Sequence, residues 1–206
     1  MGPYPKTVRL KSGTEVTLRP LEKGDLAALH QFYLNLPEED RLYLRTDVRA
    51  LPMVKMQMED SDAEERTRLV TTAGGRIVGQ AALLRPRHGW AQHTGELRCV
   101  VARELQDQGL AKILLHELFQ EATRQGVEIL FAKAAAEQAA AIRIMEGLGF
   151  RREVVRRDHQ RTLLGDLHDV LVMTCNLSDA WDRLEEMMDA MDGQGQEYGP
   201  GPRGDG

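Results

Sequence analysis

Gln106-Asp107-Gln108-Gly109-Leu110-Ala111 is the stretch of this sequence that says most about its fold and function. Residues 95–101 before it favour a strand, and residues 110–119 after it repeat apolar side chains at helical spacing. Backbone N–H groups at a helix start, backed by the helix dipole, hold phosphate groups without any lysine. Gly109 lets the backbone approach a ligand closely, and Ala111 keeps the first helical turn narrow. The loop is therefore a candidate anion-binding site.

The hexapeptide fits neither of two widespread phosphate-binding motifs. It lacks the Gly-Lys-Ser/Thr of a Walker loop and the three-glycine spacing of a dinucleotide fingerprint. A glycine at an ordinary helix start is the simpler interpretation of these six residues alone. The surrounding sequence must decide between the two.

Upstream of the loop, the pattern predicts two hairpins separated by helices. Residues 8–10 and 16–18 flank a turn that contains Gly13, and residues 68–72 and 77–84 flank Gly74-Gly75. Helical spacing of apolar residues begins after Gly24-Asp25 and stops at Pro37. Two further short helices are expected before residue 60.

Downstream, the helix after Gly109 is expected to close at Gly126. The apolar run 127–132 predicts a central strand buried on both faces, and residues 139–147 return to helical spacing. Residues 150–155 and 169–174 are the last two expected strands. Because a strand–helix–strand crossover makes its strands parallel, the fold class is α/β (α+β) with a mixed, mostly antiparallel central sheet and helices on both faces.

Residues 1–177 are expected to form one domain. Ser178 is a good N-cap for an amphipathic C-terminal helix over 178–192, with an apolar stripe and an acidic face. That helix either docks on its own domain or contacts a second copy in a homodimer. The Gly-rich residues 193–206 cannot supply a core and are expected to be disordered.

Composition excludes several classes of function. The net charge of −5 gives no general attraction to nucleic acid, and no apolar run is long enough for a membrane span. Without a signal sequence the protein is expected in the cytoplasm, where Cys99 and Cys175 would be buried, reduced thiols. The six histidines lack the spacing of metal ligands and are expected at the surface or at strand edges, so no metal is predicted.

Together with a second segment, the loop resembles the GNAT N-acetyltransferase family. That family's hallmark is Gln/Arg-x-x-Gly-x-Gly/Ala, between a strand and the helix that receives the CoA pyrophosphate. Residues 138–150, Gln-Ala-Ala-Ala-Ile-Arg-Ile-Met-Glu-Gly-Leu-Gly-Phe, resemble its Asn-x-x-Ala-x-x-x-Tyr-x-x-x-Gly-Phe segment. The resemblance covers roughly residues 14–176, and residues 18–45 are similar to bacterial protein-lysine acetyltransferases. It implies a GNAT-like fold with acetyl-CoA as co-substrate.

The resemblance also implies which residues bind acetyl-CoA. Backbone amides of 107–112 would hold the pyrophosphate, and amides near Val100 and Ala102 would hold the pantetheine and polarise the acetyl carbonyl. The cofactor-binding residues are expected to be Val100, Val101, Ala102, Gln106, Asp107, Gln108, Gly109, Leu110, Ala111, Lys112, Gln138, Ile142 and Met145.

Three departures from the family pattern bear on activity. Asp107 stands where glycine is frequent, and its carboxylate would repel phosphate unless it turned to solvent. Gln138 replaces the usual asparagine. Met145 stands where many relatives carry the tyrosine proposed to protonate the departing CoA thiolate, and a thioether cannot donate a proton.

Glu96 is the candidate catalytic base. Only the neutral form of an acceptor amine attacks a thioester, so the enzyme needs a proton acceptor, and several relatives carry a glutamate at this place. Strand alternation puts Glu96 on the same face as Arg98 and opposite Cys99, which argues against a nucleophilic role for that thiol. A strand-face ion pair between Glu96 and Arg98 is the alternative.

The sequence thus predicts an acyl-CoA-dependent N-acyltransferase that transfers acetyl directly to an amine, such as a protein lysine, a polyamine or an amino acid. Two alternatives belong to other classes. One is a non-catalytic acyl-CoA-binding regulator that uses the same pocket. The other is an interaction module that binds a partner through the acidic C-terminal helix. The basic residues Arg151, Arg152, Arg156 and Arg157 form either a solvated strand end or a contact for the CoA 3′-phosphate or an acidic substrate.

Overall fold

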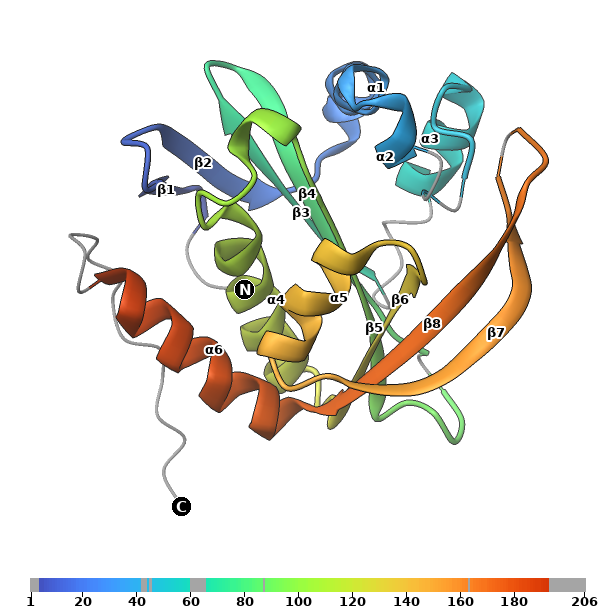
Figure 1. Cartoon of the computed structure of the whole chain (residues 1–206). Coiled ribbons are helices and arrows are strands. Elements are labelled where there is room, and N and C mark those ends of the chain that lie inside the picture. The colour runs from blue at the N-terminus through green and yellow to red at the C-terminus, as the bar shows by residue number, and fades with distance from the viewer. Residues whose placement is uncertain are drawn as a thin grey trace.

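The fold is built on one eight-stranded sheet with the strand order β1-β2-β3-β4-β5-β6-β8-β7 (Figure 1). The computed structural model describes residues 4–41, 44, 46–59, 66–86, 88–162 and 164–192. The strands are β1 (Lys6–Arg9), β2 (Glu15–Pro20), β3 (Arg66–Ala73), β4 (Arg76–Leu84), β5 (Thr94–Val101), β6 (Ile129–Ala135), β7 (Arg151–Arg161) and β8 (Leu167–Asn176). The α-helices are α1 (Leu26–Asn35), α2 (Glu38–Arg41), α3 (Leu51–Glu59), α4 (Leu110–Arg124), α5 (Ala139–Gly147) and α6 (Leu177–Asp192), and 3-10 turns occupy Lys23–Asp25 and Arg103–Leu105.

The sheet is split between β5 and β6. All other neighbouring strands are antiparallel, whereas β5 and β6 are parallel and pair only from Thr94↔Ile129 to Glu96↔Phe131. Beyond Glu96, β5 stays paired with β4, and beyond Phe131, β6 stays paired with β8. The two strands therefore diverge from each other while each keeps its outer partner. The prediction of a mixed, mostly antiparallel sheet is confirmed.

Helices cover both faces of the sheet, as expected. Successive residues of a strand point to opposite faces. Space beside Gly79 of β4 is taken by Leu110 and Leu114 of α4, whereas the next residue, Gln80, is hydrogen-bonded to Tyr33 of α1. Helices α4 and α1 therefore lie on opposite faces of β4. In Figure 1 the α1–α3 group and the α4–α6 pair accordingly occupy separate sides of the sheet.

Helix α4 forms the centre of the core because its apolar stripe is completely buried. Leu114, Leu118 and Phe119 are 0% exposed. Helix α6 packs against α4 through Ala180 and Leu184, and Trp181 stacks on His116 with ring centroids 5.2 Å apart.

His116 corrects the expectation that the histidines lie at the surface or at strand edges: it is a buried helical residue. The docking of α6 on α4 matches one of the two expected roles of the C-terminal helix. The division of the chain at residue 177 stays a prediction, and residues 193–206 lie outside the described residues.

Two predicted strands differ from the observed ones. The central strand begins at Ile129 rather than at Val127, because the Val127 N–H donates to Ala122 O at 2.9 Å and so completes the end of α4. Four of its seven residues are only partly buried, so the strand is not fully buried on both faces. Strands β7 and β8 are longer than the apolar runs suggested, since polar residues 156–161 continue an exposed edge strand.

Candidate active site

A cavity of about 620 Å³ lies where β5 and β6 separate. Its walls include Leu115 of α4 and Met145 of α5 on one face of the sheet, and Tyr33 of α1 and Arg68 of β3 on the other. Because residues from both faces line it, the cavity passes through the split in the sheet. We call the part beside α4 and α5 the cofactor side, and the part beside α1–α3 the acceptor side.

The loop before α4 has the backbone geometry of an anion site. Asp107 and Gly109 both adopt left-handed conformations, with φ values of 60° and 91°. That geometry explains a preference for glycine at position 107, where Asp is one of the few tolerated alternatives. No side chain caps the start of α4, so the N–H groups of its first turn face outward for a ligand. The Asp107 side chain is exposed, as phosphate binding beside it requires.

The turn between β1 and β2 supports this loop from the N-terminal part of the chain. Ser12 Oγ donates to Gln108 Oε1, and the Lys11 N–H donates to Gln108 O at 3.4 Å. Gln108 also donates through Nε2 to Glu104 O at 2.8 Å. Burial, and then the charge of Lys11, lower the pKa of Lys112, so two lysines from distant parts of the sequence lie near the loop.

The predicted cofactor-binding residues divide into three groups. Those that line the cavity are Val100, Val101, Gln106, Ala111, Gln138 and Met145. Leu110 and Ile142 are buried in the core instead, so their side chains serve packing. Ala102, Asp107, Gln108, Gly109 and Lys112 are not on the cavity wall. Gln138 Oε1 accepts a hydrogen bond from the Ala135 N–H at 2.9 Å, which ties the start of α5 to the end of β6.

The backbone amides that point into the split are those of Cys99 and Val101. The Ala102 N–H donates to Val78 O at 2.8 Å and is therefore engaged by β4. Since antiparallel pairs alternate in their hydrogen bonding, Val100 opposite Gln80 also directs its N–H toward β4. The amides available to a ligand are therefore those of Cys99 and Val101, each one residue before the expected Val100 and Ala102.

Glu96 is buried at the point where the split begins. Its Oε1 accepts from Arg98 Nε at 3.1 Å, and Lys133 Nζ lies 3.7 Å from Oε2. Both cations line the cavity, whereas Glu96 is not among the lining residues. The ion pair that sequence reasoning left as an alternative is therefore present.

The acceptor side contains residues that the sequence analysis did not identify. Tyr33 Oη donates to Gln80 Oε1 at 2.6 Å, and burial raises the pKa of Tyr33 to about 12. Arg68 is also buried and lines the same wall. The one signal for these residues is Gln80, a polar side chain that interrupts the otherwise apolar run 77–84 and therefore needs a hydrogen-bond partner inside the protein.

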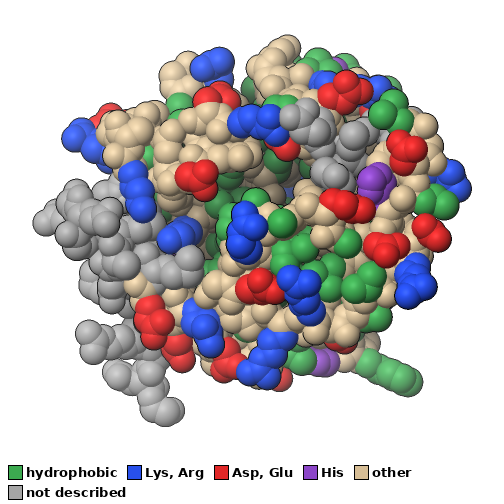
Figure 2. All heavy atoms as spheres, in the orientation of Figure 1, with side chains coloured by type: hydrophobic (Ala, Val, Ile, Leu, Met, Phe, Trp, Pro, Cys, Tyr) green, Lys and Arg blue, Asp and Glu red, His purple; other side chains and the backbone are tan. Residues whose placement is uncertain are grey.

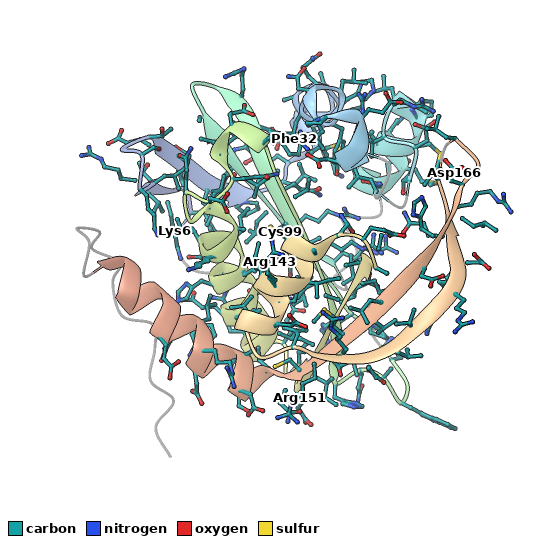
Figure 3. All side chains as sticks on the ribbon, viewed as in Figure 1. Lys6, Phe32, Cys99, Arg143, Arg151 and Asp166 are labelled. Atoms are coloured by element: carbon teal, nitrogen blue, oxygen red, sulfur yellow. The ribbon has the colours of Figure 1, made fainter. Side chains whose placement is uncertain are left out.

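Both cysteines are free thiols, and Cys175 is buried as predicted, whereas Cys99 is only partly buried. Burial raises the pKa of Cys99 to about 12, so this thiol on the cavity wall stays protonated at neutral pH. Figure 3 labels Cys99 near the middle of the molecule and Asp166 toward the outer end of the β7–β8 hairpin.

Among the described residues, no group of His, Cys, Asp or Glu could hold a metal ion, and no described helix is long and apolar enough to cross a membrane.

Comparison with characterised proteins connects this geometry to one enzyme family. The [ribosomal protein bS18]-alanine N-acetyltransferase of Escherichia coli K12 is 36% identical over 75 residues, which cover 36% of this chain and 50% of that protein. The chain thus spans about half the length of the curated relatives it matches.

Solved structures share the fold over 77–89% of this chain. The ribosomal-protein-alanine N-acetyltransferase of Brucella melitensis has a TM-score of 0.66 at 26% identity, over 77% of this chain and 98% of that one. A putative acetyltransferase from Salmonella typhimurium with its cofactor acetyl-CoA has a TM-score of 0.66 at 25% identity, over 79% and 94%. RimJ from Mycobacterium smegmatis in complex with CoA-disulfide has a TM-score of 0.72, over 89% and 94%, and at 19% identity shows a likeness of fold alone.

A family model described as "Acetyltransferase (GNAT) family" matches residues 27–150, which include the β5–α4 loop, the split and α5. Acetyl-CoA is the co-substrate of enzymes in this family. The sheet order, the split and the uncapped start of α4 agree with the sequence match, and the chain belongs to the GNAT acetyltransferase family.

Proposed function

We propose that this protein transfers the acetyl group of acetyl-CoA directly to an amine. The observation that carries the proposal is the cavity through the β5–β6 split, which connects the loop before α4 with the opposite face of the sheet. A cofactor and an acceptor that enter from opposite faces can meet there. The amine nitrogen then attacks the thioester carbonyl, the carbon–sulfur bond breaks, and CoA leaves as its thiolate.

In this arrangement the amides of the loop and of the first turn of α4 hold the pyrophosphate. The pantetheine lies on the cofactor side, between β5 and α5. The N–H groups of Cys99 and Val101 point into the split, where they can donate to the acetyl carbonyl oxygen as negative charge develops on it.

Glu96 is the proposed base, acting through a water molecule. Its carboxylate lies behind Arg98 and Lys133, which both line the cavity. We expect Glu96→Gln to lower turnover by about 10- to 1000-fold, with little change in acetyl-CoA affinity.

A matched comparison separates the catalytic role of Glu96 from its ion pair. Arg98→Gln removes the Arg98–Glu96 pair but leaves the carboxylate and its contact with Lys133 in place. With the acceptor at saturating concentration, a base predicts that Glu96→Gln lowers kcat far more than Arg98→Gln does, and equal values of kcat would refute that role.

The acceptor that we favour is the α-amine at the N-terminus of a protein. The matched relatives are named as alanine N-acetyltransferases of ribosomal proteins. An α-amine has a pKa of about 7.7–8.0, so a substantial part of it is neutral near pH 7.5, whereas only about 0.1% of a lysine of pKa about 10.4 is neutral there. Because more of the α-amine is already neutral, its acetylation depends less on a base, such as Glu96, that is engaged in ion pairs. Protein lysine, suggested by the resemblance in residues 18–45, is the alternative acceptor.

The first experiment is calorimetric titration of acetyl-CoA, CoA and ATP into the purified protein. We expect micromolar binding of acetyl-CoA and CoA and none of ATP. Thiol release is then followed with two peptides of the same sequence, one with a free N-terminal alanine and one with a blocked N-terminus and a single lysine. Absence of acetyl-CoA binding would refute the proposed function, and faster turnover of the lysine peptide would refute the preference for the α-amine.

A non-catalytic acyl-CoA-binding regulator is the second candidate, and one observation favours it. Met145 lines the cofactor side, at the position where the family resemblance places a tyrosine proposed as the acid for the leaving thiolate. A thiol of pKa about 8.5 is nevertheless a tolerable leaving group without an acid, so its loss need not stop the reaction. Tight acetyl-CoA binding without CoA release in the presence of any amine would identify the regulator.

A further inference from the structure

We propose that Gln80 of β4 binds the first carbonyl oxygen of the acceptor, and that Tyr33 of α1 orients the Gln80 amide for this role. The inference rests on the proposed transfer to an N-terminal α-amine and adds the residues that recognise such an acceptor. Gln80 would contact the acceptor directly, whereas Tyr33 would act as a positioning residue. Both lie on the acceptor side of the cavity, away from the loop that binds the pyrophosphate.

Gln80 is a polar residue in an apolar setting. It is 7% exposed and lines the cavity, within the otherwise apolar run 77–84. Its paired residues are Val70 of β3 and Val100 of β5, whose side chains share its face of the sheet. Neither valine side chain can form a hydrogen bond, so this row of paired residues offers the Gln80 amide no polar partner.

Tyr33 determines which end of the amide is available to a ligand. Tyr33 Oη donates to Gln80 Oε1 at 2.6 Å, and burial raises the pKa of Tyr33 to about 12, so the hydroxyl stays a donor at neutral pH. The reverse orientation of the amide would deprive this buried hydroxyl proton of its acceptor.

The donor end of the Gln80 amide is therefore the end left for a ligand. A glutamine amide has an acceptor oxygen and an NH₂ group that only donates. Among the described residues, Gln80 makes no side-chain hydrogen bond besides the one from Tyr33. Its Nε2 can thus donate to an oxygen atom of a molecule in the cavity.

The position of Gln80 matches the place where the acceptor amine must react. Gln80 pairs with Val100, and the N–H groups of the two neighbours of Val100 point into the split. Paired Cβ atoms lie about 5 Å apart, so a group bound to Gln80 lies beside the site of the acetyl carbonyl. In an N-terminal residue only the Cα and the carbonyl carbon separate the amine nitrogen from the first carbonyl oxygen. The amine can therefore reach the thioester while that oxygen is held by Gln80.

This contact distinguishes an N-terminal α-amine from other amines. A lysine amine is separated from the nearest backbone carbonyl by its flexible stem, and a polyamine has no carbonyl group. Charge at the surface gives no comparable basis for selection. Figure 2 shows Lys and Arg side chains mixed with Asp and Glu side chains over the visible face of the molecule. Recognition is therefore expected from hydrogen bonds inside the cavity rather than from long-range attraction.

The test compares two peptides that begin with the same free alanine and differ at one atom. In the second peptide sulfur replaces the oxygen of the first carbonyl, which keeps the amine but makes a weaker hydrogen-bond acceptor. We expect kcat/KM to be about three- to tenfold higher for the oxygen peptide, the value of one neutral hydrogen bond.

Gln80→Glu should abolish this preference without changing acetyl-CoA affinity in calorimetry. An ionised carboxylate still accepts from Tyr33 but cannot donate to the acceptor. Because Glu and Gln have the same shape, a preference caused by the larger sulfur atom would persist in the variant. Gln92→Glu, in the exposed β4–β5 turn, is the matched control and should keep the wild-type ratio. Tyr33→Phe frees the amide to rotate and should give a ratio between those of the wild type and Gln80→Glu.

The double variant Gln80→Leu with Tyr33→Phe replaces Gln80→Glu if that buried charge prevents folding, since it removes both partners of the hydrogen bond. It should likewise lose the preference for the oxygen peptide. Equal kcat/KM for the two peptides in the wild type, or an unchanged ratio in the folded variant, would overturn the inference while leaving acetyl transfer intact. Failure to acetylate the oxygen peptide at all would instead count against the proposed function.

Discussion

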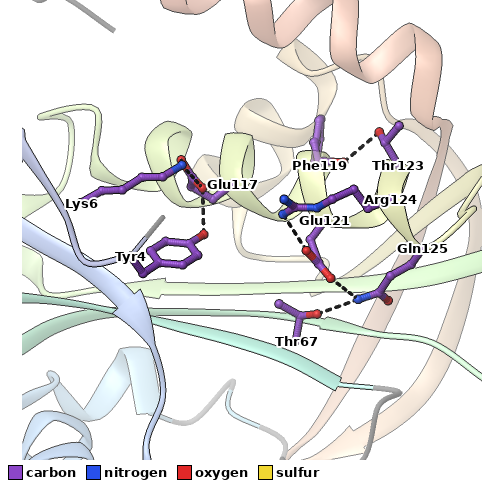
Figure 4. Close-up of polar contacts among 9 residues, drawn as sticks. All are labelled: Tyr4, Lys6, Thr67, Glu117, Phe119, Glu121, Thr123, Arg124 and Gln125. Atoms are coloured by element: carbon purple, nitrogen blue, oxygen red, sulfur yellow. Dashed lines mark hydrogen bonds and ion pairs between the residues drawn. The ribbon is translucent and has the colours of Figure 1, made fainter. Parts of the chain in front are cut away.

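Glu117 of α4 offers a direct test of how the N-terminal strand holds the cofactor-binding helix. It is 0% exposed, and its carboxylate accepts hydrogen bonds from Tyr4 Oη at 2.8 Å and from Lys6 Nζ at 2.7 and 2.8 Å (Figure 4). Burial and the hydrogen bond to Glu117 raise the pKa of Tyr4, so its hydroxyl stays a donor at neutral pH. Lys6→Met keeps the length of the side chain but removes the charge that compensates Glu117.

The expected loss of stability follows from the burial of the carboxylate. Removing one partner of a buried ion pair costs about 3–5 kcal/mol because the remaining charge is uncompensated. Lys6 keeps 25% of its side-chain exposure, so the lower end, about 3 kcal/mol, applies. For a chain of this size that corresponds to a fall in Tm of roughly 6–12 °C. The double variant Lys6→Met with Glu117→Met should recover most of the loss, since it removes the charge together with its partner.

Urea denaturation of the wild type, both single variants and the double variant measures the four free energies of unfolding. Arg9→Met is the matched control on the same strand, because the Arg9–Glu15 pair is exposed and contributes less than about 1 kcal/mol. Two results would refute the idea that this buried pair fastens β1 to α4. One is a double variant whose loss of stability equals the sum of the two single losses, and the other is a Lys6→Met variant that is as stable as Arg9→Met.

Three other substitutions probe the core and the cofactor side. Gly79→Ala would put a Cβ 2.6 Å from Thr71 Oγ1 and should lower stability by about 1–3 kcal/mol in thermal unfolding, whereas Gly24→Ala, with open space around it, is the control. If Lys11 and Lys112 hold the 3′-phosphate, Lys112→Gln should lower the affinity for CoA several-fold in calorimetry, whereas the wild type and the variant should bind 3′-dephospho-CoA with equal affinity. Equal losses of affinity for both ligands would contradict that role. Met145→Tyr supplies a proton donor on the cavity wall and should raise the single-turnover rate constant if departure of the thiolate limits it. An unchanged rate constant would exclude that limit.

The elements that carry strong local signals could be predicted from the sequence alone. Helix α5 occupies residues 139–147 as expected, and α4 begins directly after Gly109, as the glycine before the apolar stripe indicated. Local sequence patterns gave the wrong prediction where contacts with another element determine a residue's structure. Val127 reads as a strand residue but ends α4, and His116 reads as a surface residue until α6 covers it with Trp181.

The split and the acceptor side could not be predicted for the same reason. The split exists because β5 and β6 stop pairing after Glu96↔Phe131, and no residue type marks the point at which two distant strands diverge. The row of Val70, Gln80 and Val100 depends on the register of three strands, which a single sequence does not fix. Glu96 was found through family resemblance, whereas its burial behind two cations required the structure.

The form of the cavity also argues for direct transfer rather than an acyl-enzyme intermediate. An acyl-enzyme would need a nucleophile on the wall, and the thiol there belongs to Cys99, whose pKa of about 12 leaves it protonated at neutral pH. Cys99 also points toward α4, away from the face that carries Arg98 and the acceptor side. The opening through the sheet makes such a relay unnecessary, because an amine on one face can reach a thioester lying on the other. Both substrates must then be bound together before the acetyl group moves, so we expect initial-rate plots to intersect rather than to run parallel.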